Sequence, residues 1–111
     1  MAHGAVASKA FRNKALVDAA IANWRGAPLD PKVRAMVGFL EKLTFTPDDV
    51  TSADIRPLRA AGLTDEAIED AIHVCVLFNI YDRLADAFKF EIPDEEGFAL
   101  SANMLLKRGY V

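Results

Sequence analysis

The chain has 111 residues, of which 52% are hydrophobic, and its formal net charge is −3 at pH 7. This length allows one domain at most, and the interspersed charges argue against a nucleic-acid-binding surface. No run of about 18 apolar residues exists, so we expect no membrane span. One cysteine cannot form an internal disulfide, which favours a cytoplasmic location. So apolar a chain of this size is expected to form a homo-oligomer, a dimer or larger.

The first half of the sequence predicts helices separated by turn signals. Residues 4–22 have helical apolar spacing, with a weak point at Arg12–Asn13 that would allow two short helices instead. Asp30 followed by Pro31 is a strong helix start, and the helix is expected to reach about Leu43. The apolar positions of this second helix are Val33, Met36, Val37 and Leu40.

The next segment predicts short helical turns, and the chain ends in a further helix. Thr51 and Asp54 have the spacing of a capping box, and Gly62 is a helix stop. Ile55, Leu58 and Leu63 are expected to face inward between them. After an extended stretch at 90–93, a last helix should run from about Glu95 to Lys107 and end at Gly109. Because β alternation is absent, we predict an all-α fold.

The longest predicted helix, Thr64–Phe88, has about 24 residues between its N-cap and the next proline. Its apolar side changes along its length when the helix is wound at about 100° per residue. In the first half the apolar side contains Ile68, Ile72 and Cys75, and the polar side contains Glu66, Glu69, Asp70 and His73. In the second half, Leu77, Ile80, Tyr81, Leu84 and Phe88 continue the formerly polar side.

Two expectations follow for this helix. Residues 74–78 are apolar all round, so we expect them to be buried all round. The two ends should contact different neighbours, and another subunit is among the candidates.

The sequence contains few residues arranged for catalysis. A glycine-rich phosphate loop, a nucleophile elbow and metal-ligand spacings are all missing from it, so no cofactor and no metal are expected. The apolar neighbours of Cys75 indicate a buried, unreactive thiol. His73 follows Glu69 and Asp70 by about one turn, which indicates a solvated helix face.

One polar cluster on the long helix is a candidate site. Its members fall within about 100° of one another on the helix, and they are Asn79, Asp82, Arg83 and Asp86. They fit a solvated helix end with an Arg–Asp pair. They equally fit a structural hydrogen-bonded network at an intersubunit contact or lining a cavity, because a buried arginine needs partners.

The segment LFNIYDRLADAF, residues 77–88, resembles the L-F-N-x-x-N-R-x-A-D helix of the alkylhydroperoxidase AhpD-like, or carboxymuconolactone decarboxylase, superfamily. It is most similar to the peroxidase-related branch, and Asp82 stands where asparagine is usual. Residues 15–44 and 50–72 are similar to the helix, linker and helix that precede this motif in that branch. The resemblance implies an AhpD-like helical bundle.

The resemblance also implies thiol-dependent peroxidase chemistry, in which a Cys-x-x-Cys-x-x-x-His motif and an upstream glutamate serve an antioxidant oxidoreductase. This chain contains only the final histidine of that motif, because His3-Gly4 matches the family's His-Gly. His3 is therefore the one catalytic candidate, and the nearer cysteine would fall two positions before Met1. We expect residues 1–111 to be a single, N-terminally incomplete AhpD-like domain, the C-terminal portion of the family fold.

Two explanations fit the missing cysteines. In the first, Met1 is internal to a longer reading frame, whose full-length product takes a small peroxide substrate and a thiol reductant. In the second, the chain is a natural half-domain, a non-enzymatic helical oligomerisation domain. Decarboxylation of a lactone, the other chemistry in the superfamily's name, has no residues here to perform it.

Overall fold

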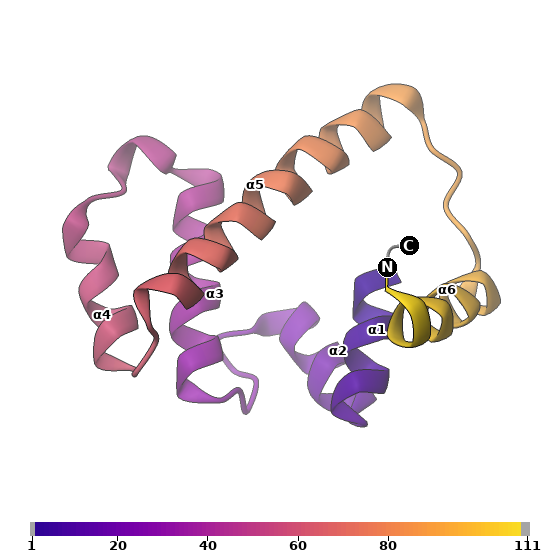
Figure 1. The fold of residues 1–111 in the computed structure, drawn as a ribbon, viewed down its shortest axis with the longest axis horizontal. Coiled ribbons are helices and arrows are strands. Elements are labelled where there is room, and N and C mark those ends of the chain that lie inside the picture. Colours follow the sequence, from indigo (N-terminus) through magenta and orange to yellow (C-terminus); the bar gives the residue numbers. More distant parts are fainter. Residues whose placement is uncertain (1, 110–111) are drawn as a thin grey trace. The chain divides into compact units, whose positions relative to one another are not determined.

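The computed structural model describes residues 2–109, which form six α-helices and two short 3₁₀ turns and contain no strand. The all-α prediction is confirmed. The chain divides into two compact units (Figure 1). Unit 1 comprises residues 2–29 and 91–109, and unit 2 comprises residues 30–90. No helix in the described part of the chain is long and apolar enough to cross a membrane. The assignment of the chain to a single domain stays a prediction.

Unit 1 contains α1 (Ala2–Phe11), α2 (Lys14–Asn23) and α6 (Glu95–Arg108). The break between α1 and α2 lies at the predicted weak point, because Arg12 adopts a left-handed φ of 52°. Asn13 then caps α2, and its Oδ1 accepts a hydrogen bond from the Leu16 N–H at 3.0 Å. The segment therefore forms two short helices rather than one.

The α1 and α6 helices of unit 1 are joined by a lysine. Lys9 Nζ donates to the carbonyl oxygen of Ala99 at 2.8 Å and to Asn103 Oδ1 at 2.7 Å. Ala102, on the same helix as both acceptors, is fully buried. The α6 helix ends at Gly109, which has a φ of 70°, as the sequence predicts.

Unit 2 contains three α-helices and the two 3₁₀ turns. In chain order they are α3 (Pro31–Phe45), η1 (Pro47–Asp49), η2 (Ser52–Asp54), α4 (Ile55–Ala60) and α5 (Asp65–Phe88). The predicted helix starts are confirmed, because Asp30 accepts from the Lys32 N–H and Thr64 accepts from the Ala67 N–H. The predicted stop at Gly62 is also confirmed, because its φ of 88° reverses the chain between α4 and α5.

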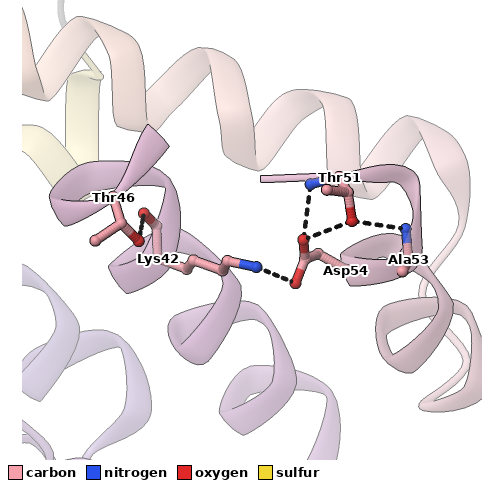
Figure 2. A network of polar contacts seen from close by, with 5 residues as sticks. All are labelled: Lys42, Thr46, Thr51, Ala53 and Asp54. Atoms are coloured by element: carbon pink, nitrogen blue, oxygen red, sulfur yellow. Dashed lines mark hydrogen bonds and ion pairs between the residues drawn. The ribbon is translucent and has the colours of Figure 1, made fainter. Parts of the chain in front are cut away.

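A polar network joins α3 to the turn that precedes α4 (Figure 2). Thr51 and Asp54 form the predicted capping box, in which the Thr51 N–H donates to Asp54 Oδ2 at 2.8 Å. The Ala53 N–H donates to Thr51 Oγ1 at 3.3 Å. Lys42 Nζ, from α3, donates to Asp54 Oδ1 at 2.7 Å. One carboxylate therefore both orders the turn and fixes it against α3.

The core of unit 2 consists of Phe39, Leu58 and Ile68, one from each of its helices. Phe39, which is not among the apolar positions named for this helix from the sequence, is buried, whereas Val33 is 43% exposed. Val33 lies in the first turn of α3, before the part of the helix that packs on α4 and α5. The predicted inward positions Ile55, Leu58 and Leu63 are confirmed, because Leu58 is buried and the other two pack against the core. Met36, Leu40 and Ile72 also pack against it.

The predicted burial of residues 74–78 is wrong. Val74 is 52% exposed, Val76 49% and Leu77 67%. The packing of α5 against the core ends at Ile72, and the helix continues beyond α3 and α4 (Figure 1). The second half of α5 therefore has few neighbours in unit 2, although its sequence is apolar.

Candidate functional site

The five candidate residues lie on two helices. His3 is an exposed residue in the first turn of α1, in unit 1. The four members of the polar cluster lie on the second half of α5, in unit 2.

Within the polar cluster the structure joins two residues and extends the group to Cys75. Arg83 Nη1 donates to the Asn79 carbonyl oxygen at 2.8 Å and to Asn79 Oδ1 at 3.2 Å. Asn79 Nδ2 in turn donates to the Cys75 carbonyl oxygen at 2.9 Å and to Cys75 Sγ at 3.4 Å. The spacing of four residues places these three side chains along one side of the helix.

The carboxylates of the cluster are separate from this chain of hydrogen bonds. Asp82, Asp86 and the Arg83 side chain are exposed, whereas Asn79 is half-buried. Arg83 bonds to an amide instead of an aspartate. The arrangement holds the Asn79 side chain in place against Cys75, and the two aspartates face solvent.

Cys75 has a more polar setting than its sequence neighbours indicate. It is half-buried, and its Sγ lies 3.5 Å from Thr44 Oγ1 as well as close to the Asn79 amide. The prediction of a wholly apolar, buried thiol is therefore wrong. The contact of Cys75 with Asn79 could be predicted from the sequence, because Asn79 lies one turn along the same helix. The contact with Thr44 could not, because Thr44 is 31 positions away.

An open pocket of about 290 Å³ lies between α4 and α5. Its apolar floor includes Ile55 and Ile72, and its rim includes an ion pair in which Arg59 Nε and Nη2 donate to the two Asp65 oxygens at 2.7 and 2.9 Å. The hydrogen bonds from Arg59 lower the pKa of Asp65 below its ordinary value. Glu69 also lines this pocket, so its lining includes two carboxylates and one guanidinium.

Metal binding has no support in residues 2–109, where no three histidine, cysteine, aspartate or glutamate side chains gather to hold an ion.

No family model matches the sequence, and no curated protein does. Among solved structures, the chain is 34% identical to an uncharacterized peroxidase-related protein from Silicibacter sp. TM1040, with a TM-score of 0.78 over 86% of this chain and 49% of that one. It is 30% identical to an uncharacterized peroxidase-related protein from Ralstonia eutropha JMP134, described as an alkylhydroperoxidase AhpD core. That TM-score is 0.80, over 91% of this chain and 52% of the other.

The chain thus spans about half the length of each of these two proteins. Over 86–91% of this chain, both the sequence, at 30–34% identity, and the fold are similar to these two proteins.

Proposed function

Because the chain has an AhpD-like, peroxidase-related fold, we propose that it forms part of a thiol-dependent peroxidase. The observation that carries this proposal is the structural likeness, with TM-scores of 0.78 and 0.80, to two proteins described as peroxidase-related. The position of His3 on a regular helix supports it further.

The proposed reaction takes an organic hydroperoxide and two thiols. A cysteine thiolate attacks the terminal peroxide oxygen, the O–O bond breaks, and the released alkoxide takes a proton to leave as the alcohol. The resulting sulfenic acid condenses with a second cysteine thiol to give a disulfide and water. An external dithiol then reduces the disulfide by exchange, so one hydroperoxide is consumed for each dithiol oxidised.

His3 is the proton carrier in this proposal. A cysteine four positions before a histidine on one helix lies on the same side, one turn away. A neutral imidazole there accepts the thiol proton, which forms the thiolate, and can then deliver it to the leaving oxygen. Ala2 and His3 both belong to the α1 helix.

Cys75 is not the nucleophile in this account. It is the one cysteine of the sequence, so no second thiol of this chain could resolve its sulfenic acid. Its nearest polar contacts are the Thr44 hydroxyl and the Asn79 amide, neither of which is a base at neutral pH. We assign Cys75 a structural role in α5.

The test supplies the two cysteines of the Cys-x-x-Cys-x-x-x-His motif. The five residues Cys-Ala-Ala-Cys-Ala are added directly before Met1 in a Cys75→Ala chain, which places the nearer cysteine four positions before His3. We expect this chain to consume cumene hydroperoxide in the presence of dithiothreitol, and the same extension with two serines to be inactive. The unextended chain should show no turnover.

Two results would contradict the proposal. Robust turnover by the unextended 111-residue chain would place the chemistry at Cys75 or outside thiol catalysis altogether. A folded extended chain without turnover would leave the non-enzymatic oligomerisation domain as the better description. Circular dichroism establishes which of the variants are folded.

A further inference from the structure

Lys9 joins the helix that carries His3 to the last helix of unit 1. Its Nζ donates to the Ala99 carbonyl oxygen at 2.8 Å and to Asn103 Oδ1 at 2.7 Å, and both acceptors belong to α6. Lys9 is half-buried, and Ala102, which lies between the two acceptors in the sequence, is fully buried. Within the described residues α6 packs mainly against α1. The contact between these two helices is therefore closely packed and also hydrogen-bonded.

The end of α1 that carries Lys9 is closed by its own backbone. Arg12 has a φ of 52°, and its N–H donates to the Lys9 carbonyl oxygen at 3.3 Å. The Asn13 N–H donates to the Ser8 carbonyl oxygen at 3.2 Å. These two bonds around a left-handed residue form the Schellman pattern that ends many helices. The Lys9 side chain thus extends from a turn that the backbone holds in place.

The first turn of α1 depends on packing against other helices. The helix has 10 residues, and isolated helices shorter than about 12–15 residues are marginal in water. Helix ends also open more readily than helix centres. His3 lies in this first turn, six positions before Lys9. Its helical conformation therefore requires that α1 stays docked on its neighbours in unit 1.

The proposed reaction requires a helical conformation at this position. The imidazole serves a cysteine four positions before it, and the two side chains lie one turn apart only while the backbone is helical. Opening of the first turn would separate them, and proton transfer is sensitive to displacements of about 1 Å.

We propose that Lys9 is a positioning residue for His3. By holding α1 on α6 it keeps the first turn of α1 helical, and it thereby keeps the imidazole one turn from the nucleophile. The catalytic part of this inference rests on the proposed peroxidase function, whereas the structural part concerns the present chain alone. The α6 helix then contributes to the site, although its two acceptors are 90 and 94 positions from Lys9.

The first test measures amide hydrogen exchange in the 111-residue chain. Lys9→Met keeps the side-chain length and removes both hydrogen bonds, so the amides of residues 6–8 should exchange faster, on the order of tenfold. Lys9→Arg keeps a donor and should restore slow exchange. Lys14→Met is the matched control, because the ion pair of Lys14 with Asp18 is exposed and lies within α2. This control should leave exchange in α1 unchanged.

Two results of the exchange test would overturn the proposal. The amides of residues 6–8 could exchange equally in the wild-type chain and in Lys9→Met, in which case the first turn does not depend on Lys9. Alternatively, exchange could accelerate equally in α1, α2 and α6, in which case Lys9 contributes to the general stability of unit 1 and positions nothing in particular.

The second test measures chemistry in the extended Cys75→Ala chain. Oxidation of the added cysteine nearest His3 by stoichiometric cumene hydroperoxide should be slower in Lys9→Met, on the order of tenfold. Lys9→Arg should react at nearly the original rate. In a His3→Gln background Lys9→Met should cause no further loss, because the residue through which Lys9 acts has been removed.

The outcomes of the second test separate the two proposals. Equal rates with Lys9 and with Lys9→Met would overturn the positioning role, as would the same loss with and without His3. A cysteine that reacts equally beside His3 and beside the glutamine of His3→Gln would instead contradict the proposed function. Amide exchange then still decides whether Lys9 holds the first turn of α1.

Discussion

The side-chain amide of Asn79 donates hydrogen bonds to both the carbonyl oxygen and the Sγ of Cys75, at 2.9 and 3.4 Å. Thr44 Oγ1 lies 3.5 Å from the same sulfur. The one thiol of the chain is thus within hydrogen-bonding distance of two polar groups.

This setting predicts that a hydroxyl can replace the thiol at little cost. Cys75→Ser should lower the free energy of unfolding by less than about 1 kcal/mol, because the hydroxyl finds partners in Thr44 and Asn79. Urea denaturation measures this difference. In an Asn79→Ala background the same substitution should cost more, since one of the two partners has been removed. Equal costs in both backgrounds would show that the Asn79 contact contributes nothing.

Leu58 is expected to be the most sensitive residue of the unit 2 core. It is 1% exposed, and Leu58→Ala should cost about 2–5 kcal/mol through lost burial and the cavity left behind. Leu100→Ala removes the same atoms at a position that is 64% exposed, and it should cost about 0.5 kcal/mol or less. Chemical denaturation of the two variants compares them directly, and similar losses would contradict the placement of the core.

The turn at Gly62 predicts a conformational penalty for any side chain there. Its φ is 88°, and an added Cβ would lie 3.2 Å from Lys32 Cε, the end of a flexible chain that can move. The backbone therefore decides the cost, and Gly62→Ala should destabilise the protein by about 1–2 kcal/mol. Gly26→Ala is the control, because Gly26 does not have a positive φ, and thermal unfolding should show a clearly smaller change.

Asp54 predicts a pH dependence of stability. Its hydrogen bond from Lys42, followed by that from the Thr51 backbone, holds the pKa of the Asp54 carboxyl below its ordinary value of about 3.9. A lowered pKa in the folded state contributes stability above the ordinary pKa, and this contribution is lost as the pH falls through the folded-state pKa.

Asp54→Asn should therefore be less stable than the wild-type chain at pH 7, and the difference should shrink as the pH falls below about 4. Urea midpoints across this range measure the effect. Lys42→Met should reproduce much of it, because Lys42 is the largest cause of the shift. A difference that stays constant with pH would indicate that ionisation of Asp54 plays no part.

Structural features that depend only on residues close together in the chain could be predicted from the sequence. The capping box of Thr51 and Asp54 and the N-caps at Asp30 and Thr64 each involve bonds across three residues or fewer, so their residue types identify them. The all-α class followed from the same local signals. The family resemblance also rested on contiguous segments, and it agrees with the fold of the two peroxidase-related structures.

Features that depend on distant neighbours were missed. Burial of residues 74–78 was inferred from their apolar character, but burial needs a packing partner, and the core contacts of α5 end at Ile72. The Thr44–Cys75 contact joins two helices and leaves no local signal. The pairing of Arg83 with Asn79 was missed because two aspartates nearby are stronger acceptors, although the helix geometry favours the residue one turn back.

The most direct measurement of the proposed peroxidase role is the rate at which the added cysteine nearest His3 is oxidised by stoichiometric hydroperoxide. It is made in the extended Cys75→Ala chain at pH 7, with His3 and with His3→Gln, and the sulfenic acid or disulfide is followed by mass spectrometry. If the imidazole takes the thiol proton, we expect the glutamine variant to react slower by a factor of about 100. Equal rates in the two chains would contradict the account, because the thiol would then be oxidised without help from His3.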